Sequence, residues 1–264
     1  MANILDKIIA RKRVEVQEAK ARVSVQQLER SALFQREPFS LAKFLRDETK
    51  SGIIAEFKRR SPSKGIINDA VSVEDVVSGY AHAGASAVSV LTDHDFFQGH
   101  EDDLIAARKV IDIPILRKDF MIDEYQIIEA KSIGADIILL IAAVLSPEEI
   151  ARLGALAKIL GLSVLLEVHN REELDRSLHA SVDAVGVNNR NLNDFTVSVE
   201  TSYQLAEHIP DSFLKVSESA ISDPAIISSL KKAGFDGFLI GENFMRTAHP
   251  GKAMQLFVQE AFQS

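Results

Sequence analysis

Short apolar runs alternate with amphipathic segments along most of this chain. Eight such runs, rich in Ile, Val, Leu and Ala, can be recognised. They are Ile53–Phe57, Ala87–Leu91, Ile113–Leu116, Asp136–Ile141, Ser163–Val168, Ala184–Asn188, Phe213–Val216 and Gly237–Ile240. Short, continuous apolar runs are typical of parallel strands that are buried on both faces. The pattern therefore predicts eight parallel strands.

The segments between the strands carry apolar residues at helical spacing. The clearest are Val73–Ala83, Glu124–Ser132, Ser146–Leu160, Arg171–Ala180, Val199–His208 and Asp223–Ala233. Several begin with a capping residue, as Ser146 does before Pro147, and several end at a glycine such as Gly134 or Gly161. Both features mark helix ends. We therefore expect helices between the strands.

The first fifty residues have a different, mainly helical pattern. Ile4, Leu5, Ile8 and Ile9 fall on one side of a helix, and a second apolar-spaced segment, Phe39–Leu45, follows Pro38. The region lacks the Gly, Ser and Pro enrichment of a linker. We expect a single domain over residues 1–264, with a helical extension at 1–50 and the strand–helix repeat at 51–264.

Two architectures fit eight strand–helix units, a closed barrel and an open, doubly wound sheet. The count of eight favours the barrel, and so does the 264-residue length. No Gly-x-Gly-x-x-Gly follows the first strand, and polar residues follow many strands rather than a few. The sequence predicts a (β/α)8 TIM barrel with an N-terminal helical extension.

Composition narrows the function classes. The formal net charge is −8, and no long basic run is present, which argues against nucleic acid as a partner. The absence of cysteine excludes disulfides and thiolate catalysis. No apolar run is long enough to span a membrane, and the start of the chain lacks secretory-signal features. We expect a cytoplasmic protein with no membrane partner.

Charged residues follow the predicted strands where a barrel places its active site. Glu56 and Lys58 are two residues apart, so they point the same way, toward the interior if Phe57 faces the helices. Lys118 and Glu167 end two other strands. A lone Lys or Glu at such a place is usually a solvated loop residue. Two carboxylates and two ammonium groups in one mouth instead favour acid–base catalysis.

The loops after the last two strands have features of an anion site. They contain Ser219–Ser222 and Gly241–Asn243, and such loops often bind phosphate in barrels. Gly241 would let a backbone N–H approach an anion without a side chain in the way.

One segment, Ile54–Gly65 with the sequence IAEFKRRSPSKG, closely resembles the signature of the indole-3-glycerol-phosphate synthase family. The resemblance extends over essentially the whole chain. It continues through Leu91–Asp93, Phe96–Gly99, Pro114–Phe120, Leu166–His169, Gly186–Arg190, Ser217–Ser219 and Phe238–Glu242.

The resemblance implies a reaction. The substrate would be 1-(2-carboxyphenylamino)-1-deoxyribulose 5-phosphate, a small phosphorylated aromatic molecule. The enzyme would close the pyrrole ring, expel carbon dioxide and remove water, as a lyase of tryptophan biosynthesis. No cofactor and no metal would be required. The acidic, cysteine-free composition is compatible with a monomer or a weak dimer.

The resemblance also implies catalytic roles. Lys118 would be the general acid that protonates the reacting carbonyl or its hydroxyl, and Glu167 its acid–base partner. Glu56 would orient or charge that partner, and Lys58 would contact the substrate's carboxylate or phosphate. Asn188 would position Glu167 or a substrate hydroxyl. A lysine can serve near neutrality if burial and neighbouring cations lower its pKa.

The implied binding residues surround these groups. Arg190 would bind the anthranilate carboxylate, and Phe97 and Phe120 would form walls for the aromatic ring. The other substrate-binding positions would be Ser61, Glu218, Ser219, Ala220, Leu239, Gly241 and Glu242, the last through its backbone N–H. Ala220 stands where the family usually has Gly, so a left-handed backbone there would be strained by about 1 kcal/mol. We then expect phosphate affinity to change modestly.

Three other interpretations fit less well. A phosphoribosylanthranilate isomerase uses a Cys and an Asp, and this chain has no Cys. A Schiff-base aldolase needs a Lys on the sixth strand, which ends with Asn188. A non-catalytic phosphate-binding barrel would be expected to lack a charged catalytic residue, yet all are present.

Overall fold

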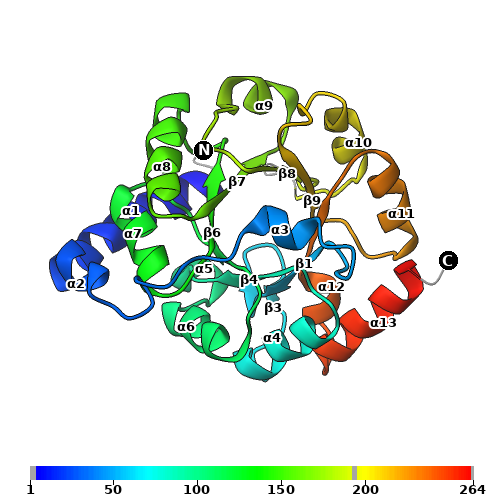
Figure 1. Ribbon diagram of the computed structural model, residues 1–264, viewed down its shortest axis with the longest axis horizontal. Coiled ribbons are helices and arrows are strands. Elements are labelled where there is room, and N and C mark those ends of the chain that lie inside the picture. The colour runs from blue at the N-terminus through cyan, green and yellow to red at the C-terminus, as the bar shows by residue number, and fades with distance from the viewer. Residues whose placement is uncertain (1–3, 192–194, 263–264) are drawn as a thin grey trace.

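The computed structural model describes residues 4–191 and 195–262. Eight parallel strands close into a barrel in the order β1-β10-β9-β8-β7-β6-β5-β4 (Figure 1). The strands are β1 (Ile53–Phe57), β4 (Ala87–Leu91), β5 (Ile115–Lys118), β6 (Ile137–Ile141), β7 (Ser163–Val168), β8 (Ala184–Asn188), β9 (Leu214–Glu218) and β10 (Gly237–Ile240). A short hairpin, β2 (Arg60–Ser61) with β3 (Gly65–Ile66), follows β1. The expected TIM barrel is confirmed.

Helices surround the barrel (Figure 1). They are α4 (Val73–His82), α5 (His94–Phe97), α6 (Glu101–Val110), α7 (Glu124–Ser132), α8 (Pro147–Ile159), α9 (Arg171–Ser177), α10 (Glu200–Ala206), α11 (Ala225–Lys232), α12 (Glu242–Met245) and α13 (Pro250–Phe262). The six predicted helices are present, four of them (α8, α9, α10 and α11) shorter than predicted by two or three residues. The sequence pattern did not single out α6 and α13, nor the one-turn helices α5 and α12.

The side chains of β1 alternate between two apolar layers. Ile54 packs in the barrel interior, whereas Ile53, Ala55 and Phe57 belong to the layer between strands and helices. Because Phe57 faces the helices, Glu56 points into the barrel, as expected.

Two strands end later than the apolar pattern predicts. The third strand along the barrel, β5, begins at Ile115 rather than Ile113, because Pro114 has no N–H to donate to a sheet. It also extends to Lys118, which pairs in register with Leu91. The seventh, β9, extends to Glu218. Two charged residues of the predicted site thus belong to the barrel wall, which holds their backbones rigidly.

The N-terminal extension forms α1 (Ile4–Arg22), α2 (Val25–Glu29) and α3 (Leu41–Leu45). Figure 1 shows α3 across the centre of the barrel, where Leu41 and Leu45 pack against the interior side chains. Helix α3 begins two residues later than predicted, because Ser40 caps it by accepting the Lys43 N–H. This helix closes the amino end of the barrel.

A buried carboxylate, Asp136, anchors the extension to the barrel. Its Oδ1 accepts hydrogen bonds from Arg36 at 2.6 Å and from the Phe39 N–H at 2.7 Å. Its Oδ2 accepts hydrogen bonds from Arg108 and from the Ile115 N–H. One side chain therefore joins the extension, α6 and β5.

Helix α1 is anchored at the opposite, carboxyl end. The buried Lys12 on α1 lies 2.8 Å from Asp93 and 2.9 Å from Asp119, which follow β4 and β5. Burial alone would lower the pKa of Lys12, but these carboxylates raise it above its ordinary value. The ammonium group is therefore charged and ties α1 to the barrel.

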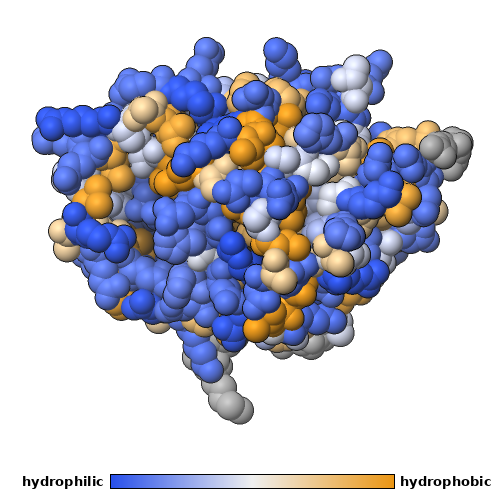
Figure 2. All heavy atoms as spheres, turned by 90° about the horizontal axis from the view of Figure 1, so that it is seen from below, coloured by the Kyte–Doolittle hydropathy of each residue, from blue (hydrophilic) through white to orange (hydrophobic). Residues whose placement is uncertain are grey.

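The surface shown in Figure 2 is mainly hydrophilic, with hydrophobic side chains in small patches. Among the described residues, no helix combines the length and the apolarity needed to cross a bilayer.

Candidate active site

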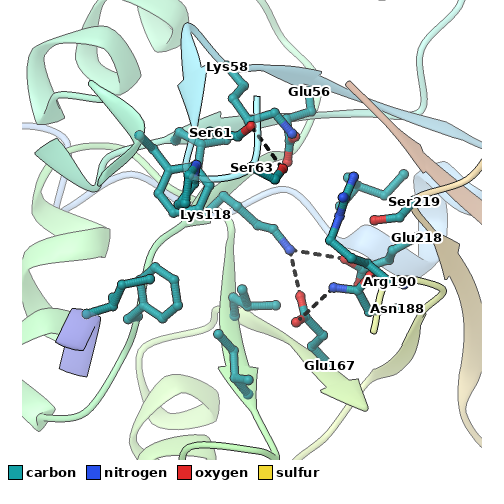
Figure 3. Close-up of a pocket in the computed structure, with 18 of the residues that line it drawn as sticks. Glu56, Lys58, Ser61, Ser63, Lys118, Glu167, Asn188, Arg190, Glu218 and Ser219 are labelled. Atoms are coloured by element: carbon teal, nitrogen blue, oxygen red, sulfur yellow. Dashed lines mark hydrogen bonds and ion pairs between the residues drawn. The ribbon is translucent and has the colours of Figure 1, made fainter. Parts of the chain in front are cut away.

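A pocket opens at the carboxyl ends of the strands (Figure 3). Its empty volume is about 1050 Å³ including the open mouth, which is enough for a phosphorylated aromatic molecule. It is lined by Ile4, Leu5, Ile8, Glu56, Lys58, Ser61, Pro62, Ser63, Leu91, Phe97, Lys118, Asp119, Phe120, Leu139, Ile141, Glu167, Asn188, Arg190, Phe195, Glu218, Ser219, Leu239 and Glu242. The five predicted catalytic residues are all among them.

Lys118 lies at the centre of the charged groups. Its Nζ donates to Glu167 Oε2 at 2.8 Å and to Glu218 Oε2 at 3.0 Å (Figure 3). Asn188 Nδ2 donates to the other oxygen of Glu167 at 3.2 Å. Four side chains from β5, β7, β8 and β9 thus form one hydrogen-bonded cluster. The contact between Asn188 and Glu167 is one of the two anticipated for Asn188.

The pKa of Lys118 is not lowered by burial and neighbouring cations, which was the condition under which a lysine could serve near neutrality. Burial does act to lower its pKa, but Glu167, Glu218 and Glu56 outweigh burial and raise the pKa above the ordinary value. The neighbours are carboxylates rather than cations, so the condition for a lowered pKa of Lys118 is not met. Lys118 is a fully charged donor.

The two carboxylates that share Lys118 are not equivalent. Burial would raise the pKa of Glu167, but Lys118 and His169 hold it below its ordinary value. For Glu218, burial raises the pKa to about 7, opposed by Lys118 and assisted by Glu167. Glu218 had been grouped with the substrate-binding residues, and the structure places it within the charged cluster.

A second charged pair lies across the mouth. Lys58 Nζ donates to Glu56 Oε1 at 2.7 Å, so these side chains do point the same way. A Cβ at position 241 would lie 2.6 Å from that same Glu56 oxygen. Gly241 is therefore required for space beside Glu56, a reason that the sequence alone did not provide.

The apolar wall of the pocket has more components than predicted. Phe97 from α5 and Phe120 after β5 lie with ring centroids 6.1 Å apart. Leu139 and Ile141 from β6 line the floor, and residues of α1 line the wall as well. The apolar side of α1 was visible in the sequence, but its pattern did not reveal which surface it covers.

An adjoining hollow is rich in cations and polar groups. Lys58, Lys64, Arg190 and Arg246 line it, together with Ser219, Ala220, Gly241, Glu242 and other residues of the last two strand loops. Ser219 and Ala220 have φ angles of 66° and 59°. Ala220 therefore has the left-handed backbone for which strain was anticipated.

The remaining predicted binding residues also lie at the mouth. Ser61 is nearly buried and accepts the Lys64 N–H at 3.3 Å, and Leu239 lines both hollows. The Glu242 side chain lies 3.9 Å from Arg190 and 3.8 Å from Lys64. All fifteen candidate residues are thus brought to one end of the barrel. In residues 4–191 and 195–262, no cluster of three His, Asp or Glu side chains has the arrangement of a metal site.

The sequence profile of the family described as indole-3-glycerol phosphate synthase matches residues 5–257. The chain belongs to the indole-3-glycerol phosphate synthase family. A protein named indole-3-glycerol phosphate synthase from Bacteroides thetaiotaomicron is 49% identical over 98% of this chain and 99% of its own length. One of the same name from Laribacter hongkongensis is 43% identical over 96% of this chain and 98% of its own.

A solved structure titled "Native KDPGal structure" resembles this fold with a TM-score of 0.56. It covers 80% of this chain and 96% of its own, at 17% identity. At that identity the likeness supports the barrel architecture alone.

Proposed function

We propose that this protein converts 1-(2-carboxyphenylamino)-1-deoxyribulose 5-phosphate to indole-3-glycerol phosphate. The observation that carries the proposal is the position of Lys118, a buried cation between Glu167 and Glu218 beside an aromatic wall. The same pocket opens onto a hollow lined with cations. A doubly anionic aromatic substrate requires this combination. A barrel kept only for binding would not need a buried charged cluster, which is costly to maintain.

We propose one orientation of the substrate in the site. Its aromatic ring lies against Phe97 and Phe120, and its carboxylate faces Lys58 and Arg190. Its phosphate occupies the hollow formed by the last two strand loops, near Ser219 and Gly241. Apolar walls bind the ring, while the cations compensate the two negative charges.

Lys118 begins the reaction by giving a proton to the carbonyl oxygen of the substrate. A carbon–carbon bond forms between the carbonyl carbon and the ring carbon that bears the carboxylate. That carboxylate leaves as carbon dioxide, and its bonding electron pair restores the aromatic ring. Lys118 is then reprotonated from solvent, because the decarboxylation of a carboxylate consumes one proton overall.

Dehydration completes the indole. The new hydroxyl leaves as water with a proton from Lys118, while Glu167 removes a proton from the neighbouring methylene carbon. The double bond of the pyrrole ring forms between these two carbons. Glu167 can return its proton to Lys118 across their 2.8 Å contact. The proton donors and acceptors that act on the substrate in this scheme are the side chains of Lys118 and Glu167, with solvent restoring one proton, so the proposal includes no metal or organic cofactor.

The proposal also covers the oligomeric state, the location and the partner of the protein. The protein would act as a monomer or a weak dimer in the cytoplasm, on a small molecule rather than on nucleic acid. Its net charge of −8 supports the last point.

The test is product analysis. Purified protein treated with EDTA is incubated with the substrate, and the product is identified by mass spectrometry. We expect a product lighter by one carbon dioxide and one water, with carbon dioxide released in equal amount. An unchanged substrate with folded protein would contradict the proposal.

A further inference from the structure

His169 is a largely buried residue after β7 to which neither the sequence nor the proposed mechanism assigns a role. It follows β7 and lies two residues after Glu167, so both side chains point toward the mouth. Its side chain is only 9% exposed. The Nε2 atom lies 3.4 Å from Glu167 Oε1. This atom is buried and makes no hydrogen bond of ordinary geometry with any described residue. A ring nitrogen without an ordinary hydrogen bond thus lies beside the proposed base.

The other ring nitrogen is held by Glu173. Nδ1 of His169 lies 3.1 Å from Glu173 Oε2, and the same oxygen accepts the His169 backbone N–H at 2.8 Å. Asn170 caps α9 and donates to the second oxygen of Glu173 at 3.0 Å. Since three hydrogen bonds fix the Glu173 carboxylate, the imidazole ring has one defined orientation.

A ring placed between two carboxylates is expected to be an imidazolium. A neutral ring would direct a lone pair at one of the two carboxylates, which is unfavourable in a buried site. Burial alone would lower the pKa of His169, but Glu167 and Glu173 raise it to about 10. The ring is therefore a second cation beside Glu167, in addition to Lys118.

Because of this second cation, Glu167 and Glu218 have different surroundings, although both carboxylates contact Lys118. The charged groups facing them are Lys118 from β5, Glu56 from β1, and His169 with Glu173 beside β7. Among the described residues, Glu167 contacts both cations, whereas Glu218 forms an ion pair with Lys118 only. The second oxygen of Glu218 is buried with no hydrogen-bond partner among the described residues. Different surroundings of this kind assign different acid–base roles to paired carboxylates.

We propose that His169, oriented by Glu173, is a positioning residue that keeps Glu167 ionised and aimed at the reaction. It thereby makes Glu167, rather than Glu218, the base of the pair. The inference rests on the proposed function of the site. His169 itself need not touch the substrate, and it acts through Glu167.

The kinetic test compares His169→Gln and Glu173→Gln with the wild type across pH. Without the imidazolium, Glu167 holds a proton to higher pH, so the acidic limb of the kcat profile is expected to move up by about one unit in His169→Gln. The loss is then about tenfold on that limb and shrinks at high pH. Glu173→Gln, which keeps the shape but loses the charge, is expected to move the limb in the same direction. The control His82→Gln changes an exposed histidine on α4 and is expected to leave the profile unchanged.

A double-mutant cycle with Glu167→Gln separates positioning from structural support. Because His169 acts through Glu167, His169→Gln is expected to have no further effect on the residual kcat of Glu167→Gln. A loss that is equal at all pH values, or that persists in the Glu167→Gln background, would overturn the proposal.

An NMR titration of the histidine rings tests the arrangement without requiring turnover. We expect the His169 ring nitrogens to remain doubly protonated at pH 8 in the wild type, and to lose a proton at lower pH in Glu167→Gln. A neutral His169 ring at pH 8 would overturn the inference. A wild type without turnover but with this imidazolium would count against the proposed function, while the charge arrangement would stand.

Discussion

Lys118 is the single residue on which the proposed chemistry depends most, with Glu167 as its partner. Lys118→Ala and Glu167→Gln are each expected to lower kcat by about 10²–10⁴-fold, the range for a lost acid–base group. Steady-state kinetics with circular dichroism as the folding control provides the measurement. Near-normal turnover in both variants would show that the mechanism is wrong, even though the family is right.

Ala220 offers a test of backbone strain in the loop after β9. Its φ of 59° is costly for any residue with a Cβ, so Ala220→Gly is expected to raise the free energy of unfolding by about 1 kcal/mol. The control Ala155→Gly, on the exposed side of α8, is expected to lower it by about 1 kcal/mol. Urea denaturation compares the two. The KM should change only modestly, and destabilisation by Ala220→Gly would contradict the assigned strain.

The titration of Glu218 links stability to pH. Burial raises the pKa of this carboxyl to about 7, so the folded protein holds the proton more tightly than the unfolded chain does. Its stabilising contribution is therefore complete below the ordinary pKa of a glutamate and is lost as pH rises through about 7. Glu218→Gln stays neutral, and its melting temperature relative to the wild type is expected to rise between pH 5 and pH 8. A difference in melting temperature that is constant from pH 5 to pH 8 would show that Glu218 does not titrate in this range.

At the scale of elements, α1 is the helix that most directly connects packing with function. Lys12 fixes it to Asp93 and Asp119, and its first two turns place Ile4, Leu5 and Ile8 in the pocket wall. The structure thus gives the N-terminal extension two functions, since α3 closes the amino end of the barrel and α1 completes the site.

Removing the Lys12 charge should affect both stability and substrate binding. Lys12→Met leaves two buried carboxylates without this cation. The substitution is expected to lower the free energy of unfolding by about 3–5 kcal/mol and to raise KM more than it lowers kcat. Lys20→Met on the same helix breaks an exposed pair with Asp123 and is expected to cost less than about 1 kcal/mol. Thermal unfolding and steady-state kinetics of both variants provide the comparison. Equal effects would show that Lys12 has no special role.

At the scale of the whole molecule, the sequence predicted the barrel well because buried parallel strands have an unmistakable apolar pattern. Its errors have physical causes. Pro114 moves the start of β5, and charged residues such as Glu218 extend strands because they point into the mouth rather than into the core. The periodicity shows that α1 has a buried side, but not that this side covers the active site.

The charged candidates, Glu56, Lys58, Lys118 and Glu167, were found because strand ends meet at one mouth, so position along the chain implied proximity. The resemblance to the family added others, such as Ser61 and Phe97. The sequence could not predict the protonation state of each group. The pKa of Lys118 depends on three carboxylates from other strands, and the position of His169 between two carboxylates depends on the turn from β7 into α9. Such effects depend on distances of a few ångströms, which no spacing in the sequence reveals.

We propose that the extension and the barrel, residues 1–50 and 51–264, form one domain over residues 1–264. Asp136 at one end and Lys12 at the other join the two parts through buried charged groups. These contacts support a single folding unit, because neither part can separate without exposing unpaired charges.

The most direct test of the account is a continuous assay of indole fluorescence with the wild type and Lys118→Met side by side. The chain contains no Trp, so the background emission is low. When 1-(2-carboxyphenylamino)-1-deoxyribulose 5-phosphate is added to EDTA-treated protein, we expect indole emission to rise with the wild type and to stay nearly flat with Lys118→Met. A flat trace from folded wild type, or an equal rise from both proteins, would contradict the central claim that Lys118 catalyses indole formation in this pocket.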